Sequence, residues 1–128
     1  MQLVRLNGRC RAGKGHFAAA AALTAGTAAL RPGSYVIEDA PTAGIRLGWG
    51  HYLRDVAVTG NVVRRAGIGI AVSVAPGAGS ALIADNLIAA TRHGAVVGME
   101  WGKAVTGDLA AENAIRYAQL SISGNRVR

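Results

Sequence analysis

The sequence has one cysteine, few aromatic residues, no acidic residue among its first 34 positions and no long apolar run. A single cysteine in 128 residues excludes a disulfide framework and a zinc site built from cysteines. No apolar stretch reaches the ~20 residues that a membrane-spanning helix needs. The six aromatic residues are few for a chain that is 51% hydrophobic, so aliphatic side chains and alanine supply most of the apolar content. The length allows one domain and argues against two.

The net charge of +7 is distributed unevenly along the chain. Residues 1–34 hold five Lys and Arg and no acid, whereas residues 35–128 hold nine Lys and Arg against seven Asp and Glu. A nucleic-acid-binding protein is expected to carry its positive charge on a folded face, interleaved with aromatic residues, or along one helix. The body of this chain, with a net charge of only +2, lacks that pattern. We therefore expect no nucleic-acid partner.

Residues 1–34 differ in composition from the body and form a separate basic, Ala-rich segment. Eight of the fourteen residues at 17–30 are alanine. A basic start followed by an apolar stretch is the outline of a secretory leader. Alanine is barely hydrophobic, however, and Arg9 and Arg11 do not form an arginine pair because Cys10 separates them. We expect an Ala-rich helix or an irregular N-terminus here rather than a leader.

Self-similarity is the strongest pattern in the body. Three segments align on an asparagine that follows Gly or Asp and an alternating run of small or apolar residues; the asparagines are Asn61, Asn86 and Asn125. Short alternating strands bounded by Gly and Asn, repeated at about 25 residues, are typical of a parallel β-solenoid. Asparagine tolerates the left-handed backbone of a tight turn, and stacked asparagines form hydrogen-bonded ladders. We expect such a ladder at these three positions.

The repeat predicts an all-β fold with columns of inward-facing apolar residues. The expected members are Val56, Val58, Val63, Ile70, Val72, Ile83, Ile88, Ala95 and Val97. The interval from Asn86 to Asn125 is longer than the first one, which predicts a loop insertion at about 100–118. Inserted loops of solenoids gather on one face and commonly carry binding. A small antiparallel sandwich is the alternative that the strand spacing also permits.

Two tryptophans are the most informative candidates for a binding site. Trp49 is followed by a glycine and His51, and Trp101 is followed by a glycine and Lys103. Each tryptophan follows the third strand of its repeat, so we expect both on one edge of the fold. An exposed indole face beside a charged or imidazole group suits a sugar ring, and we take these four residues as candidate carbohydrate contacts. In the alternative interpretation, the rings cover the edge or pack under the inserted loop.

The acidic residues give no sign of catalysis. They are Glu38, Asp39, Asp55, Asp85, Glu100, Asp108 and Glu112. A glycoside hydrolase needs two carboxylates on one face, spaced for acid and base or nucleophile roles. Glu38 and Asp39 are adjacent, so their side chains point apart if the segment is extended, and Asp85 lies at an expected turn. His51 and His93 lack a third ligand at metal spacing. We expect no catalytic residue, no cofactor and no metal.

Longer motifs in the body resemble a known family. They are LGWGHYLRDVAVTGN at 47–61, GIGIAVSVAPGAG at 67–79, ADNLI at 84–88 and AVTGDL at 104–109. From about residue 36, the chain resembles the C-terminal part of the twin-arginine-translocated uncharacterised repeat proteins of alphaproteobacteria. That family looks like part of the right-handed parallel β-helix group, the architecture of pectate lyases. The resemblance implies a right-handed parallel β-helix of about three coils and a periplasmic or secreted location. It implies no reaction, because the family has none assigned.

The chain departs from the family at residues 1–34, which do not match and lack a twin-arginine leader. We therefore expect a truncated or mis-started copy, which leaves its localisation open. The expected function is that of a non-catalytic repeat module, structural or surface-binding, with polysaccharide as the expected partner. A fragment of a carbohydrate-active enzyme, either a polysaccharide lyase or a glycoside hydrolase, is the alternative, and a non-functional remnant is the third hypothesis. An uncapped solenoid edge also predicts self-association.

Overall fold

The fold is described by a computed structural model that covers residues 35–111 and 117–128, together with the backbone of five short strands before them. These five are β1 (Val4–Leu6), β2 (Arg9–Ala12), β3 (His16–Ala18), β4 (Ala22–Leu23) and β5 (Ala28–Leu30). The body contains β6 (Tyr35–Leu47), β7 (Val56–Thr59), β8 (Val62–Ser73), β9 (Ala81–Ala84), β10 (Leu87–Thr91), β11 (Val96–Glu100), β12 (Lys103–Asp108), β13 (Leu120–Ser123) and β14 (Arg126–Val127). The described residues hold no helix that is long and apolar enough to cross a membrane.

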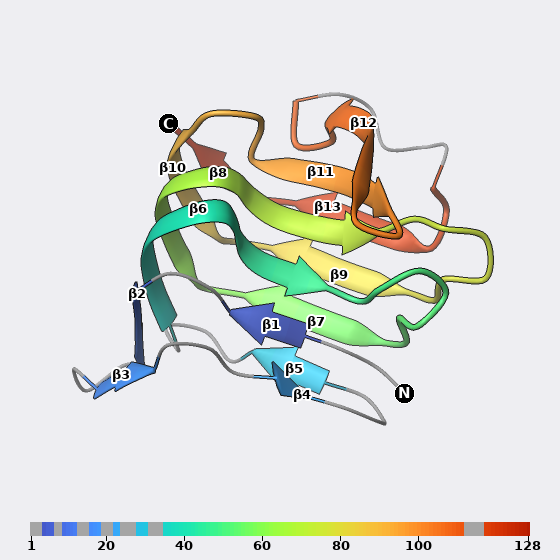
Figure 1. The fold of residues 1–128 in the computed structure, drawn as a ribbon, viewed down its shortest axis with the longest axis horizontal. Coiled ribbons are helices and arrows are strands. Elements are labelled where there is room, and N and C mark those ends of the chain that lie inside the picture. Colours follow the sequence, from blue (N-terminus) through green and yellow to red (C-terminus); the bar gives the residue numbers. More distant parts are fainter. Residues whose placement is uncertain are drawn as a thin grey trace.

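Two sheets enclose the core (Figure 1). The smaller sheet has the strand order β13-β9-β7-β5, and all of its pairs are parallel. The larger sheet follows the path β12-β11-β8-β6-β1-β4, with β2, β3, β10 and β14 attached beside it. The long strands β6 and β8 curl between the two sides of this sheet: the first part of β8 pairs with β10, and its second part pairs with β11. The result is a curled half-barrel.

The expected right-handed parallel β-helix of about three coils is wrong for this structure. The chain is all-β, but its larger sheet is mixed: β6 pairs antiparallel with β1 and β2, and β12 returns antiparallel along β11. One physical reason is the turn at Trp101 and Gly102, where both residues have positive φ, 51° and 83°. Such a two-residue turn reverses the chain and joins antiparallel strands. The expected Ala-rich helix is also wrong for the described part of residues 17–30, because β3, β4 and β5 are strands.

The strands that carry the 25-residue repeat pair parallel with one another, and β5 adds one further parallel pair with β7. Val56 of β7 lies opposite Ala81 of β9, which lies opposite Leu120 of β13. Ile45 of β6 lies opposite Ile70 of β8 in the same way. The repeat therefore sets the register inside both sheets, while the antiparallel strands lie along the edges of the larger one.

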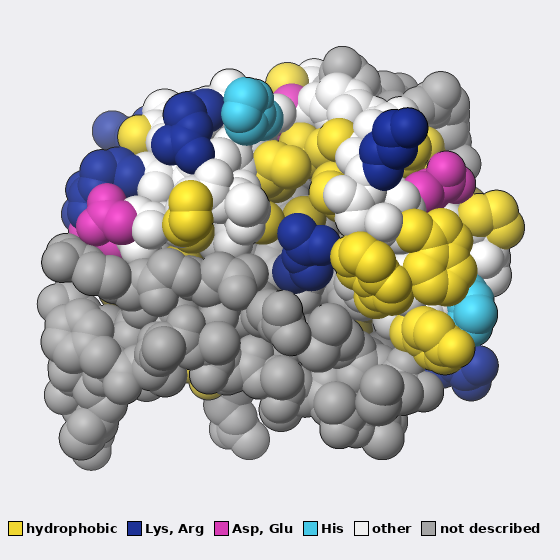
Figure 2. Space-filling model, viewed as in Figure 1, with side chains coloured by type: hydrophobic (Ala, Val, Ile, Leu, Met, Phe, Trp, Pro, Cys, Tyr) yellow, Lys and Arg dark blue, Asp and Glu magenta, His cyan; other side chains and the backbone are white. Residues whose placement is uncertain are grey.

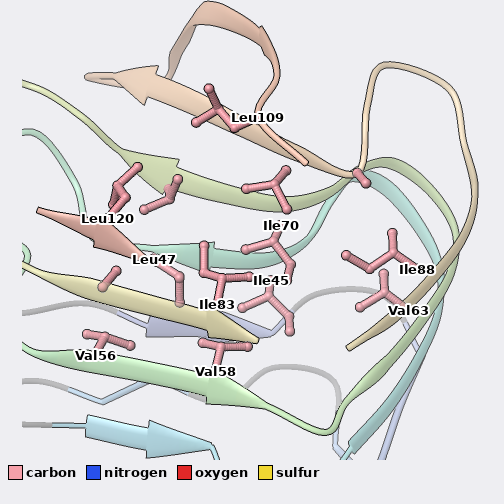
Figure 3. Packing of buried hydrophobic residues seen from close by; sticks show 14 of the residues in the cluster. Ile45, Leu47, Val56, Val58, Val63, Ile70, Ile83, Ile88, Leu109 and Leu120 are labelled. Carbon is pink, nitrogen blue, oxygen red and sulfur yellow. The ribbon is translucent and has the colours of Figure 1, made fainter. Parts of the chain in front are cut away.

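The core lies between the two sheets and consists almost entirely of aliphatic side chains (Figure 3). Its largest fully buried members are Ile37, Ile45, Leu47, Leu53, Ile70, Ile83, Ile88, Val58, Val63 and Val72. Burying one such side chain stabilises the fold by about 1.5–3 kcal/mol. Most of the expected inward columns are confirmed, but the prediction for Val97 is wrong. Val96 lies opposite Ile70 in the core, whereas Val97 lies opposite Ala71 in a second, smaller cluster. A register difference of one residue moves a side chain to the other face of a strand.

Candidate functional site

The three repeat asparagines form a hydrogen-bonded column along the turns. The backbone N–H and Nδ2 of Asn61 donate to Oδ1 of Asn86 at 3.0 and 3.2 Å, and the same groups of Asn86 donate to Oδ1 of Asn125 at 3.0 and 2.9 Å. At the first end of the column, the buried Oδ1 of Asn61 has no partner among the described residues. These contacts connect neighbouring turns, so the column has a structural role.

The left-handed backbone at these turns is not on the asparagines, contrary to the expectation. It falls on the residue before each one: Gly60, Asp85 and Gly124 have φ of 70°, 58° and 65°. Two of the three are glycine, which adopts this conformation without steric cost. Asp85 therefore has the turn role expected for it, and the asparagines serve to link one turn to the next.

Four rings lie together at one end of the outer face of the larger sheet; we call Trp49, His51, Tyr52 and Trp101 the aromatic patch. The ring centroid of Trp101 is 6.4 Å from that of Trp49, 5.6 Å from that of His51 and 6.5 Å from that of Tyr52. Figure 2 shows hydrophobic side chains gathered at this end, near basic side chains and a histidine. The exposed fractions of Trp49, Tyr52 and Trp101 are 39%, 42% and 52%. The patch is thus half open to solvent.

The backbone of residues 49–52 fixes one side of the patch. Trp49 and Tyr52 exchange two backbone hydrogen bonds, of 3.3 and 2.9 Å, around a tight reversal in which Gly50 has a φ of 57°. The hydroxyl of Ser73, buried in β8, donates to the carbonyl oxygen of Gly50. Hydrogen bonds within the turn, and one from Ser73 of β8, therefore hold this turn in place.

Each tryptophan packs on the glycine of the opposite turn. A Cβ added to Gly50 would lie 2.3 Å from ring carbons of Trp101, and a Cβ added to Gly102 would lie 2.5 Å from a ring carbon of Trp49. Real Cβ atoms do not approach other atoms so closely. Both glycines are required for these contacts, because any larger residue would displace the facing indole.

A small hollow lies between the two indoles and the sheet. Arg46, Trp49, Ser73, Met99 and Trp101 are among its lining residues, and its volume is about 10 Å³. That volume is about the minimum that one water molecule occupies. The guanidinium carbon of Arg46 lies 5.7 Å from the ring centroid of Trp49, within cation–π range. A ligand of any size must therefore bind on the exposed ring surfaces rather than inside a cavity.

Of the four candidate carbohydrate contacts, the structure brings three together. Lys103 is exposed at the start of β12, opposite Glu100, and makes no ion pair or cation–π contact among the described residues. Sequence reasoning missed Tyr52 and Arg46. The signal for Arg46 was its place between the inward-facing Ile45 and Leu47, which points it to the outer face.

Three of the described acidic residues, Glu38, Asp39 and Asp108, make structural contacts at two separate places. Glu38 and Asp39 both bind Arg65, at 2.7 and 2.6 Å, although their side chains were expected to point apart. They converge because Asp39 has a φ of 58° and is not extended. The side-chain hydrogen bond with Asp39, and then that with Glu38, raises the pKa of Arg65 further above its already high value. The guanidinium and the two carboxylates thus form one ion-pair cluster between β6 and β8.

Asp108 closes the hairpin that carries Trp101. Its carboxylate accepts backbone hydrogen bonds from Ala95, Val96 and Ala110 at 2.9, 3.1 and 2.9 Å. Sequence reasoning missed this role, because the three donors lie on both sides of the hairpin. Within the described part of the chain, no group of three or more His, Cys, Asp or Glu residues is placed to hold a metal ion.

No family model, curated protein or solved structure matches the chain.

Proposed function

We propose that this chain is a non-catalytic, surface-binding module that binds polysaccharide through the aromatic patch. The observation that carries the proposal is the conformation of Trp101, which is half exposed at a φ of 51°. Two-residue turns of this kind favour Asn or Gly, and a bulky residue held in the left-handed region costs about 1–3 kcal/mol. Backbone strain of this kind clusters at functional sites. The exposed indole is the group that this strain presents to solvent.

The chemistry of the patch suits a sugar. Aromatic faces take the apolar C–H face of a sugar ring, while nearby polar groups take its hydroxyls. The Arg46 guanidinium and the His51 imidazole supply donors and an acceptor beside the indoles. With a hollow of only about 10 Å³, stacking on the surface is the mode of binding that the patch supports.

The test is a binding screen against soluble polysaccharides by affinity electrophoresis, with Trp49→Ala and Trp101→Ala. We expect the native chain to be retarded by at least one polysaccharide and both variants to lose most of that retardation. Trp101→Asn is the matched control for strain, because Asn suits the turn but lacks the ring. It should lose binding while unfolding at the same or a higher urea concentration than the native chain. Retardation that survives in Trp101→Asn would contradict the proposal.

A carbohydrate-active enzyme is the alternative outcome of the same screen. A lyase would release unsaturated products that absorb in the ultraviolet, and their appearance would overturn the non-catalytic proposal. Three of the described carboxylates already have structural roles, because Glu38 and Asp39 bind Arg65 and Asp108 caps backbone groups. A periplasmic or secreted location, proposed from the sequence resemblance alone, is tested by fractionation of the native cells.

Self-association through exposed strand edges is a further part of the proposal. The outer edges of β13 and β14 carry no partner strand among the described residues. Unpaired edges are templates for pairing with another chain. Two arginines, Arg126 and Arg128, lie on or beside β14 and would repel a second copy there, so pairing through β13 is the arrangement we expect. Sedimentation at rising protein concentration tests it, and a monomer throughout would rule it out.

A further inference from the structure

The angles between the ring planes of the aromatic patch limit the kind of glycan that the patch can bind. The inference drawn from these angles rests on the proposed function. The plane of Trp101 makes angles of 81° with Trp49, 81° with His51 and 88° with Tyr52. No neighbouring ring of the patch is coplanar with Trp101. A flat polymer surface contacts rings that lie in one plane. The patch instead forms a corner between the plane of Trp101 and three rings that stand nearly perpendicular to it, of which His51 and Tyr52 are inclined to each other by 45°.

The corner is fixed before any ligand arrives. Trp101 lies against Gly50 and Trp49 lies against Gly102, so neither indole can turn far toward the other turn. The turn at 49–52 is hydrogen-bonded within itself, between Trp49 and Tyr52, and to β8, from Ser73 to Gly50. The turn at 101–102 joins Glu100 and Lys103, which lie opposite each other in the paired strands β11 and β12. A ligand that needed coplanar rings would have to break these contacts. Rings held in advance bind with less loss of conformational entropy.

The separation of the rings limits how much of a glycan the corner holds. Carbon atoms in contact lie about 3.5–4.0 Å apart, so a sugar stacked on Trp101 places its edge against a perpendicular ring whose centroid is 6.4 Å from that of Trp101. One face of Trp49 already carries the Arg46 guanidinium at 5.7 Å. That face is closed to a second sugar, and Arg46 is placed to donate to a hydroxyl of the first.

We propose that the aromatic patch recognises a single sugar unit at the end or at a branch of a soluble glycan, and not the flat surface of an aggregated polymer. The ring of that unit stacks on Trp101, its edge contacts Trp49 and Tyr52, and its hydroxyls bind Arg46 and His51. The rest of the glycan chain leads away from the patch and adds no contact there.

The experiment is titration calorimetry with glucose, galactose, mannose and N-acetylglucosamine, each as oligosaccharides of one to six units, together with pull-down on crystalline cellulose and chitin. For at least one sugar series, we expect the affinity to stop rising by the second unit, with later units changing it by less than about two-fold. We expect no retention on either crystalline polymer. Tyr52→Ala should weaken the shortest binding ligand several-fold, while Tyr52→Phe should keep most of its affinity.

Two outcomes separate this inference from the proposed function. Affinity that rises with every unit to the sixth, or retention on a crystalline polymer that Trp101→Asn abolishes, would overturn the single-unit inference alone. The patch would then bind glycans as an extended platform. Absence of binding by every oligosaccharide and every soluble polysaccharide would overturn both.

Discussion

The Nδ2 group of Asn86 donates a 2.9 Å hydrogen bond to Oδ1 of Asn125, although 39 residues separate the two along the chain. Asn86 also donates to the Val58 carbonyl at 3.1 Å and accepts from Asn61. It is buried, with only 1% of its surface exposed. This one side chain therefore connects three successive turns. Because it is buried, water does not replace its hydrogen-bond partners when they are removed.

Asn86→Ala is expected to lower the free energy of unfolding by about 3 kcal/mol, because it leaves several buried polar groups without partners. Urea unfolding followed by circular dichroism measures the loss. Asn125→Ala is the matched control at the more exposed end of the column, where water replaces part of what is lost, and should cost about 1 kcal/mol. Equal costs for the two variants would show that burial does not set the strength of the column.

Asp108→Ala is expected to destabilise the hairpin of β11 and β12 by about 2 kcal/mol, since three backbone N–H groups lose their acceptor. Asp108→Asn keeps one oxygen. That oxygen can serve Val96 and Ala110, so this variant should cost about half as much. Hydrogen exchange at the Ala95, Val96 and Ala110 amides checks the mechanism. Unchanged protection of these amides in Asp108→Ala would contradict it.

Ser73→Ala is expected to loosen the turn that holds one side of the aromatic patch. The Ser73 side chain is buried, and its hydroxyl is the partner of the Gly50 carbonyl. We expect a loss of about 1 kcal/mol in stability and a shift in tryptophan emission. Ser121→Ala, on the exposed face of β13, removes a hydroxyl without such a partner and should change neither quantity. If Ser73→Ala changes neither the stability nor the tryptophan emission, the turn does not depend on its hydrogen bond from β8.

The sequence predicts the strands and the spacing of the asparagine column, because both depend on local alternation and on a fixed repeat. It does not predict the mixed sheet. The direction of β12 depends on a two-residue turn in which Trp101 takes a conformation that its residue type disfavours. The pairing of Glu38 and Asp39 with Arg65 was missed for the same reason, since positive φ at Asp39 and Arg65 brings the groups together. Predictions from sequence patterns assume ordinary backbone conformations, so they fail at these positions of positive φ.

The sequence predicts part of the candidate site. The Trp-Gly pairs at 49–50 and 101–102 indicated two exposed indoles on one edge, and the structure places their centroids 6.4 Å apart. The perpendicular orientation of the two indole planes depends on the packing of each indole against the glycine of the opposite turn. Tyr52 adds a third ring, perpendicular to Trp101. That relationship joins turns about 50 residues apart, which no local pattern encodes.

Gly50→Ala tests this glycine–indole contact directly. The new Cβ would lie 2.3 Å from ring carbons of Trp101, and Gly50 also has a φ of 57°, so both strain and a clash oppose the substitution. We expect a loss of about 2–3 kcal/mol, displacement of the indole and loss of glycan binding. The only two tryptophans of the chain lie in the patch, so a red shift of the emission reports that displacement. Gly77→Ala is the matched control, because Gly77 has a φ of 88° but its added Cβ meets only the Cβ of His51, at 3.3 Å. It should cost about 1 kcal/mol of backbone strain and leave the tryptophan emission unchanged. If the two variants behave alike, the effect lies in the backbone and not in the contact with Trp101.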